Sequence, residues 1–568
     1  MRFKNQKSTF GVGLAVLMAA CLTACGGGGD DVAATTPATS TGTTSPNTPT
    51  PTPAPAKPQN DFQASCTGTG CAAADPATYS GSGIGVWSAA NTGVSAKVAQ
   101  ANITTTGGLT GQDVRVVYTN PTDAPAAFST FVKPASANTV SPQSVQLPVT
   151  TDDQIRERIQ EFNRTGFAKL LGPRASESQM GIAGMRLQAS TVYAVNDQRQ
   201  WNDMNNVART ATLVKQQAAG DGKMINLWVE NTEIAANRIT QAIINKTLDT
   251  YARSGGVYDM LTSVGGPLWG PQPYSNLVGP TQPIDLVLLN FDNNAKPFGI
   301  VGYFYGLNNV LKSSQPTSNE SISLYLDTET MYLGGSFGLQ ASLMTLAHEG
   351  MHMQNFYRRA VLKGQPYAFD TWLEEQSAMM MEDWASFNID ATFNNVRDTR
   401  VSGFVQTAAY TCPLTTFTSS SGQCDSYSVN GSFGGFLNRQ LGLNFYKDML
   451  TRTDSTDSKT LLDNAIKAAR SDSSFNAEAE RFAVTMAALM PATGGPSRYS
   501  FPVRAESGFQ LPAINLKPYQ ATQRLATLPA SLVPHSAFVS RRGAATGTYS
   551  DTITVPPGTS AWVVIQPK

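Results

Sequence analysis

His348-Glu349-Gly350-Met351-His352 contains two of the three histidines in this chain of 568 residues. On a helix, side chains at positions i and i+4 lie one above the other, so both imidazoles would face the same way and could hold one metal ion. Glu349 lies beside them, close enough to take a proton from a water on that metal. The pattern predicts a catalytic metal site, against the alternative of two ordinary helix histidines around a solvated glutamate.

The flanking residues predict that this stretch is a helix with one apolar face. Its members recur at steps of three and four: Leu339, Leu343, Leu346, Gly350, Met353 and Tyr357. Gly350 costs about 1 kcal/mol of helix propensity relative to alanine, so we expect a neighbouring element to approach closely there. We expect the nearby methionines to pack, because thioethers are poor ligands for zinc.

A third ligand must come from elsewhere, because a catalytic zinc usually takes three protein ligands and leaves one position for water. His535 is a candidate only because it is the remaining histidine. Residues 371–378, Thr-Trp-Leu-Glu-Glu-Gln-Ser-Ala, predict the start of a second helix. Thr371 and Glu374 fit a capping box, which leaves Glu375 as the favoured ligand. The alternative is that both glutamates only favour the positive end of the helix dipole.

These two motifs together resemble the gluzincin metallopeptidases, and the chain is most similar to the hyicolysin family, peptidase family M30. The similarity covers about residues 190–500 and includes 284–289, 300–306, 318–326 and 427–446. It implies an α+β fold: a zincin-like catalytic domain with a two-helix zinc site, flanked by small β-rich N- and C-terminal domains. It also implies one catalytic zinc held by His348, His352 and Glu375, with Glu349 as general base.

Two departures from the family pattern affect the second helix. Glu374-Glu375-Gln376 stands where the family usually has Asn-Glu-Gly, which bears on the register of the third ligand. Met379 stands where some gluzincins place an aspartate that orients the first histidine. That support must come from another group, and Glu382, Asp383 and a backbone carbonyl are the alternatives.

The metal chemistry predicts a further donor, because the oxyanion that develops during peptide hydrolysis needs stabilisation besides zinc. Tyr427 is the candidate, since it precedes a helix-like segment at 433–441 and matches a tyrosine that recurs in the family. The alternative is a packed aromatic, in a chain with 18 tyrosines. We interpret Phe304, Tyr305 and Tyr325 as strand core and groove wall.

The N-terminus predicts export. Basic residues precede an apolar segment from Phe10 to about Leu22, which is too short to span a membrane as a mature helix. The segment 22–26, Leu-Thr-Ala-Cys-Gly, looks like a bacterial lipobox. The resemblance implies a signal peptide at 1–24 and lipidation of Cys25, in an outer-membrane lipoprotein that faces the periplasm or the cell surface. Simple secretion is the alternative. Residues 25–60 predict a low-complexity tether.

Besides Cys21 and Cys25, the chain has four cysteines, which form two close pairs, Cys66 with Cys71 and Cys412 with Cys424. In an exported chain such pairs favour local disulfides. A structural zinc site made from all four is the rival interpretation.

Composition shifts predict four regions after the tether. They are a β-rich N-terminal domain at 61–150, a connecting helix and linker at 151–189, the catalytic domain at 190–500 and a β-rich C-terminal domain at 501–568. The predicted elements are strands at 114–118, 225–229, 322–326 and 561–565, and helices at 152–166 and 232–251. Residues before about 165 could also form a removable prosegment.

Taken together, the sequence predicts a membrane-anchored zinc endopeptidase that acts on extracytoplasmic polypeptides. Equal counts of 41 acidic and 41 basic residues argue against a nucleic-acid partner. Two alternatives stay open. One is an aminopeptidase, although residues 304–309 lack the acidic group that would hold a substrate amine. The other is a surface adhesion or host-binding protein with a vestigial catalytic domain.

Overall fold

The computed structural model describes residues 59–132, 151–174, 192–418, 424–542 and 546–568. The predicted signal peptide, Cys25 and nearly all of the tether lie outside these residues. The fold is mixed, with several sheets and many helices, which confirms the α+β class. Among the described residues, no helix combines the length and the apolar character needed to cross a membrane.

Residues 198–327 contain a six-stranded sheet, in the order β13-β14-β12-β11-β10-β9. Strands β11, β12 and β14 run parallel, and every residue of β12 and β14 is buried, as expected for strands covered on both faces. The short β13 pairs antiparallel with β14 and forms one edge. The bounds are β9 Gln198–Asn202, β10 Ala208–Ala218, β11 Met224–Glu230, β12 Ile284–Leu289, β13 Gly302–Tyr303 and β14 Ile322–Asp327.

The helix predicted over 232–251 is wrong as a single element. The structure has α3 at Asn231–Ala235 and α4 at Gln241–Ala252. Asn237 between them takes a left-handed φ of 53°, which a continuous helix does not allow, and Thr240 begins the new helix by accepting a hydrogen bond from the amide of Ile243.

The motif helix is α7, Gly335–Asn355, which continues into a π-helical segment, η3, at Phe356–Val361. It packs on α5, Val257–Gly265, and follows α6, Thr328–Leu333. A Cβ on Gly350 would lie 2.4 Å from Cδ1 of Leu261 in α5. The close approach expected at Gly350 is therefore confirmed. Met344, Met351 and Met353 are buried in the core.

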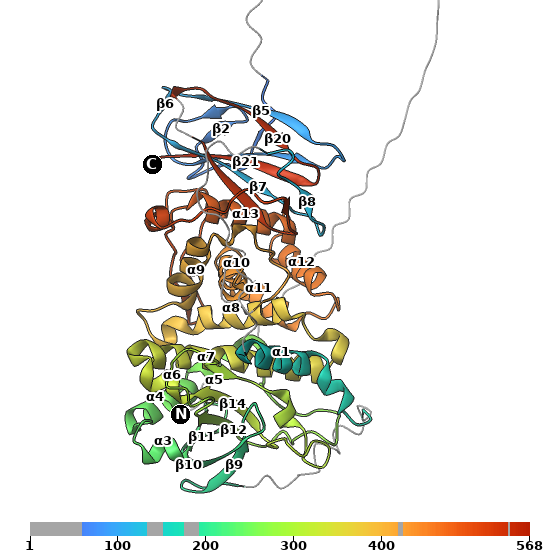
Figure 1. Ribbon diagram of the computed structural model, residues 1–568, viewed down its shortest axis with the longest axis vertical. Coiled ribbons are helices and arrows are strands. Elements are labelled where there is room, and N and C mark those ends of the chain that lie inside the picture. The colour runs from blue at the N-terminus through green and yellow to red at the C-terminus, as the bar shows by residue number, and fades with distance from the viewer. Residues whose placement is uncertain (1–58, 133–150, 175–191, 419–423, 543–545) are drawn as a thin grey trace, which may run out of the picture. The chain divides into compact units, whose positions relative to one another are not determined.

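The second motif helix is α8, Thr371–Ile389, which packs between α7 and α10, Ser426–Leu441 (Figure 1). Helix α1 occupies Thr151–Arg164, close to the predicted helix at 152–166. The remaining helices are η1 Gly166–Lys169, η2 Gly306–Asn309, η4 Gln365–Tyr367, η5 Val396–Arg400, α9 Val401–Thr407, η6 Ala409–Thr411, α11 Leu443–Thr451, α12 Ser458–Ala469, α13 Phe475–Ala488, η7 Ser497–Tyr499 and η8 Lys517–Ala521.

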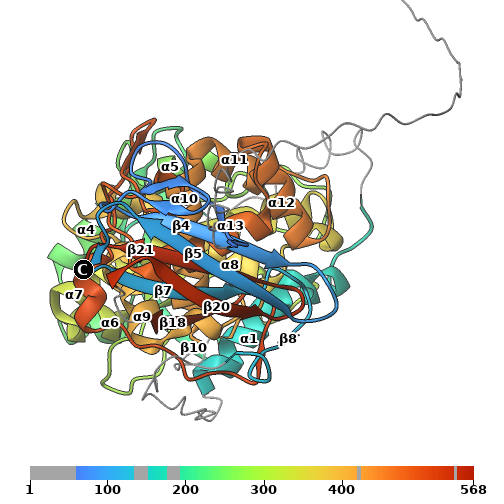
Figure 2. The same cartoon turned by 90° about the horizontal axis from the view of Figure 1, so that it is seen from above.

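The β-rich ends of the chain pair with each other, whereas the sequence suggested two separate small domains. One sheet has the order β1-β4-β21-β7-β18, so that C-terminal β21 lies between N-terminal β4 and β7 (Figure 2). All eight residues of β21 are buried, and a shared apolar core joins both ends. Neither end has a complete sheet alone. The bounds are β1 Gln63–Ala64, β4 Gly85–Asn91, β7 Asp113–Thr119, β18 Ala537–Arg542 and β21 Thr559–Gln566.

Smaller pairings complete the β region. A second sheet has the order β2-β3-β5-β20, again with strands from both ends. Its bounds are β2 Ala73–Asp75, β3 Thr78–Tyr79, β5 Lys97–Thr105 and β20 Tyr549–Val555. The two-stranded pairs are β6 Leu109–Thr110 with β19 Thr546–Gly547, β8 Ala126–Ala127 with β17 Ser531–Leu532, and β15 Arg504–Glu506 with β16 Phe509–Leu511. The disulfides Cys66–Cys71 and Cys412–Cys424 are both present.

Candidate metal centre

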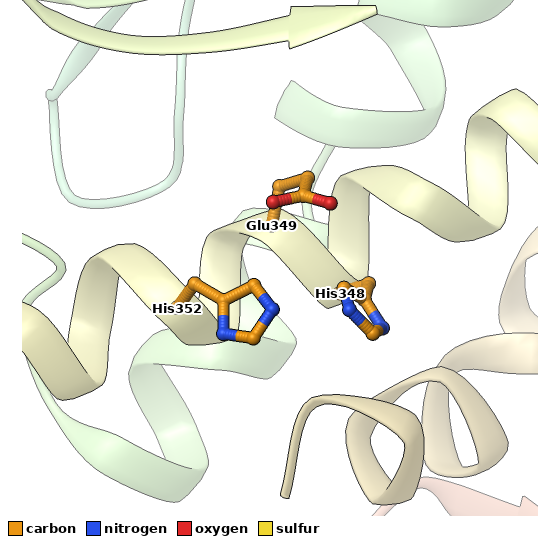
Figure 3. Close-up of side chains that lie close together, drawn as sticks. All are labelled: His348, Glu349 and His352. Carbon is orange, nitrogen blue, oxygen red and sulfur yellow. The ribbon is translucent and has the colours of Figure 1, made fainter. Parts of the chain in front are cut away.

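Helix α7 presents the two histidines on one side, as their spacing predicts. Figure 3 shows both imidazoles projecting from the same side of the helix, with the carboxylate of Glu349 on the neighbouring side. The ring centroids of His348 and His352 lie 4.7 Å apart. One ligand atom from each of His348, Glu349 and His352 can be chosen so that all three lie within 4.8 Å of one another.

Helix α8 places the carboxylate of Glu375 opposite both imidazoles. Its Oε2 lies 3.2 Å from Nε2 of His348, and its Oε1 lies 3.6 Å from Nε2 of His352. Glu375 is 3% exposed, so bulk water does not separate these groups. The structure thus brings the three predicted ligands together. His535 is elsewhere: its Nε2 lies 2.9 Å from Asp123, and its ring packs on Phe475.

The other nitrogen of each imidazole also faces a carboxylate of α8. Nδ1 of His348 lies 3.1 Å from Glu382, and Nδ1 of His352 lies 2.9 Å from Glu374. Glu382 follows Glu375 by seven residues, two helical turns, so both project toward α7. Of the alternatives for supporting His348, the structure places Glu382 beside it. Asp383 instead pairs with Arg439 at 2.7 Å.

The capping box predicted for Thr371 and Glu374 is wrong. Asp370 is the N-cap residue, with extended backbone angles, and Thr371 is already the first helical residue. A capping box needs its glutamate three residues after the N-cap, and Leu373 holds that position. The carboxylate of Glu374 is therefore free to reach α7, where it also accepts hydrogen bonds from Nδ2 of Asn355 at 3.1 and 3.2 Å.

The glutamates around the two imidazoles give this cluster an excess of negative charge, which a bound cation would balance. Burial would lower the pKa of each imidazole, but the surrounding glutamates raise the pKa of both His348 and His352. Burial also opposes ionisation of Glu375, yet the charges of His352 and His348 lower its pKa to about 2. A neutral imidazole carries one N–H and cannot donate to two carboxylates.

A cation between the Nε2 atoms and Glu375 would remove this conflict, and each Nδ1–H could then serve the second carboxylate. Two imidazole nitrogens and one carboxylate oxygen, with a fourth position left for water, form a ligand set typical of catalytic zinc. The residues present therefore fit that ion.

Glu349 is held beside the cluster by the backbone of the sheet edge. Its Oε2 accepts a hydrogen bond from the amide of Phe304, the residue after β13, at 2.8 Å. Burial raises the pKa of Glu349. A carboxylate with a raised pKa takes up a proton more readily near neutral pH, as a general base must.

Tyr427 lies at the same cavity as the histidines and Glu349. It belongs to the first turn of α10, which begins at Ser426 and is capped by Asp425, earlier than the predicted 433–441. Its ring centroid lies 6.4 Å from that of His348, with the Arg400 guanidinium 5.3 Å away. Burial raises the pKa of Tyr427, so its hydroxyl remains protonated and able to donate.

Sequence reasoning missed the residues that α1 brings to the site. Nε2 of Gln160 donates to Oε1 of Glu375 at 2.6 Å, and Asn163 bonds to the backbone after β13. The periodicity of α1 predicted a helix, but no local signal tied it to motifs about 190 residues away. Arg400 was also missed, and it contacts Glu382 at 3.4 Å.

Comparison with known proteins gives two family matches. The model described as Peptidase M30 matches residues 205–566, and a domain of unknown function, DUF8571, matches residues 64–132. A search of curated proteins found no match. The first match covers more than half of the chain and includes α7, α8, α10 and the C-terminal strands. Helix α1 lies in neither matched range.

Proposed function

Because this chain belongs to the peptidase M30 family, we propose that it is a zinc-dependent endopeptidase that hydrolyses extracytoplasmic polypeptides. Family membership makes it a peptidase; the metal, the residue roles and the location are our proposal. The observation that carries the proposal is the convergence of His348 Nε2, His352 Nε2 and the Glu375 carboxylate beside the buried Glu349.

Each residue has one role in this proposal. His348, His352 and Glu375 would hold the ion, which when bound would supply a water with a pKa of about 7 and a Lewis acid for the scissile carbonyl. Glu349 accepts the proton of the attacking water and passes it to the leaving amine. The hydroxyl of Tyr427 donates to the oxyanion that develops on the carbonyl.

Two further glutamates would orient the ligands. Glu374 is hydrogen-bonded to Nδ1 of His352, and Glu382 lies 3.1 Å from Nδ1 of His348, so the two carboxylates would fix the tautomers and leave each Nε2 for the ion. Glu382 is positioned in turn by Arg400 and by a hydrogen bond from Asn395. Helix α8 thus supplies one ligand and both orienting carboxylates.

The carboxylates around the cavity favour an endopeptidase over an aminopeptidase. An aminopeptidase needs an additional acidic group for the substrate amine. Among the described residues that line the cavity, the carboxylates are Glu349, Glu374 and Glu375. Each already faces an imidazole or a backbone amide. A vestigial site in an adhesion protein is the second alternative, and the complete set of ligands, base and orienting groups argues against it.

The test is to measure zinc content and hydrolysis of an unlabelled protein mixture by the mature chain. We expect about one zinc per molecule and internal cleavage sites in the products. Glu349→Gln should keep the zinc but lower the rate at least about a thousandfold, whereas the exposed Glu157→Gln should match the parent. Release of N-terminal residues alone would indicate an aminopeptidase, and an inert parent chain with or without zinc would indicate a binding protein.

We also propose that the enzyme is anchored to the outer membrane through a lipidated Cys25, which lies outside the described residues. Support comes from the apolar segment and the small residues before Cys25. Cys25→Ser should release the protein into the soluble fraction without a change in specific activity. Unmodified soluble protein in cells that express the parent chain would favour simple secretion.

A further inference from the structure

Helix α1 packs on η2 and η3 and lines the proposed catalytic cavity. The α1 residues that line the cavity recur at steps of three and four, which places them on one face: Arg156, Ile159, Gln160, Asn163 and Arg164. The opposite face, which includes Glu157, is exposed. The helix therefore presents one face to the metal cluster and the other to solvent.

Gln160 brings a side-chain amide to the proposed metal ligands. Its Nε2 donates at 2.6 Å to Oε1 of Glu375, the same oxygen that faces Nε2 of His352. A carboxamide has the donor and acceptor groups of a peptide bond. The side chain of Gln160 thus places a peptide-like group against a proposed metal ligand.

Asn163 brings a second amide to the edge of the sheet. Its Nδ2 donates to the carbonyl of Phe304 at 3.0 Å, and its Oδ1 accepts from the amide of Gly306 at 2.8 Å. Phe304 directly follows the edge strand β13, and Gly306 is the first residue of η2. An extended peptide pairs with a free edge through backbone carbonyl and amide groups. Asn163 therefore occupies the carbonyl of Phe304 beside the edge that a polypeptide would use.

The space beside α1 is narrow. The cavity has a volume of about 90 Å³, whereas sites for small ligands measure about 300–1,000 Å³. The buried residues of α1 are Ile155 and Ile159, and Phe162 packs edge-on against Tyr305, so a small apolar contact holds the helix in place.

We propose that α1 is an internal inhibitor that competes with the substrate for the cavity through the amides of Gln160 and Asn163. This inference rests on the proposed function. Helix α1 lies outside the range that matches the peptidase family, as expected for an element that does not take part in the reaction.

The sheet topology indicates displacement of α1 rather than loss of the whole N-terminal region. Strands β4 and β7 flank β21, so removal of every residue before about 165 would also strip the shared sheet. Displacement makes a kinetic prediction. When only a fraction of the molecules has α1 displaced, the apparent affinity for substrate falls by that fraction, whereas turnover of bound substrate does not change.

The experiment compares Asn163→Ala with the parent and with Glu157→Gln, in the full mature chain. Loss of two hydrogen bonds should lower KM for a protein substrate about tenfold and leave kcat and zinc content unchanged. Asn163→Asp, which keeps the acceptor but turns the donor into an oxygen that faces the carbonyl of Phe304, should lower KM at least as much and serves if the alanine variant folds poorly. A higher KM, a lower kcat or an unchanged KM would overturn the inference, because α1 would then bind substrate or not limit access.

Hydrogen exchange supplies a readout that does not depend on activity. The backbone amides of α1 should exchange faster in Asn163→Ala than in Glu157→Gln, in both zinc-free and zinc-loaded protein. Equal exchange would mean that Asn163 does not hold the helix, which also overturns the inference. Failure of the proposed function is distinguishable, since it would appear as absent zinc or absent hydrolysis in the parent chain.

Discussion

Helix α8 carries two neighbouring buried acids, Glu382 and Asp383, in two different charge environments. Asp383 forms an ion pair with Arg439 in which both side chains are fully buried, and Asn394 and Asn438 donate further hydrogen bonds to it. That charge is balanced within the chain. Glu382 belongs to a cluster of four carboxylates around two imidazoles, with Arg400 at its margin.

The difference separates a structural cluster from a functional one. Buried charges are tolerated when they are paired and hydrogen-bonded, and Asp383 meets both conditions. In the His348–His352 cluster, by contrast, carboxylates outnumber the cationic groups, and each imidazole lies between two of them. A bound cation would balance this excess of negative charge. The incomplete charge balance, more than the burial, therefore marks this cluster as the candidate metal site.

Replacement of a ligand should give the largest effect. Structural zinc sites bind with about 10–16 kcal/mol, so loss of one of three ligands should weaken zinc binding about a thousandfold. We expect this for Glu375→Gln, measured by competition with a chelator. Asp383→Asn is the matched change in the Asp383–Arg439 pair, whose charges balance within the chain, and it should leave zinc affinity unchanged. Equal loss of zinc in both variants would contradict the distinction between the two clusters.

The Asp383–Arg439 pair should contribute to the stability of the fold. Asp383→Asn leaves the buried Arg439 without its ionic partner, which should lower the free energy of unfolding by about 3–5 kcal/mol. Denaturant unfolding of the zinc-free protein measures this directly. A loss as small as that of an exposed substitution such as Glu157→Gln would show that Arg439 finds another partner.

The sequence predicted those parts of the site that depend on local spacing. His348 and His352 are one helical turn apart, and Glu375 is close to a helix start, so short patterns suffice. Glu382 could be named only as one of several alternatives, since its contact with His348 depends on how α7 and α8 pack. Glu374 was misassigned because the N-cap lies at Asp370, one residue before the expected position.

Long-range pairing was not predictable from local patterns. The strands at 114–118 and 561–565 were each expected, yet their pairing joins residues more than 400 positions apart. Alternation of apolar and polar residues reveals a strand but not its partner. The same limit applies to Gln160 and Asn163, whose side chains reach the site only through the placement of α1.

Tyr427→Phe tests whether the tyrosine hydroxyl at the proposed metal cluster acts in the reaction. A catalytic donor should lose roughly 10²-fold in kcat with little change in KM, because the bond to the oxyanion forms mainly in the transition state. Tyr410→Phe is a matched control, since its buried hydroxyl bonds to Gln523 outside the described cavity, and it should keep the parent kcat. Equal kcat for Tyr427→Phe and the parent would assign Tyr427 to packing.

The orienting carboxylates should give a smaller effect on the metal. Glu382→Gln keeps the shape of the side chain but weakens the acceptor for His348 Nδ1, so zinc affinity should fall about 10- to 100-fold. For Glu374→Gln we expect a decrease in zinc affinity at the lower end of that range, since the side chain of Glu374 is 24% exposed. If Glu374→Gln removes zinc and Glu375→Gln does not, the two glutamates have exchanged roles.

The pH dependence of zinc stabilisation should give the smallest effect and tests the charge balance itself. Without zinc, the glutamates raise the pKa of His348 and His352 above the usual value near 6.5. A raised imidazole pKa contributes stability that is fully present below about pH 6.5 and is lost as pH rises through the folded-state values.

In the zinc-loaded protein the ion replaces those protons, so this loss does not occur. The difference in Tm between loaded and zinc-free protein should therefore grow as pH rises above about 6.5, by several degrees at most. His535 has a pKa lowered by burial and contacts none of the ligands, so its contribution is the same in both forms and cancels. A Tm difference that stays constant from pH 6 to pH 9 would mean that the carboxylates do not hold protons on the imidazoles. The surroundings of Glu382 and Asp383 would then differ less in charge balance than their geometry indicates.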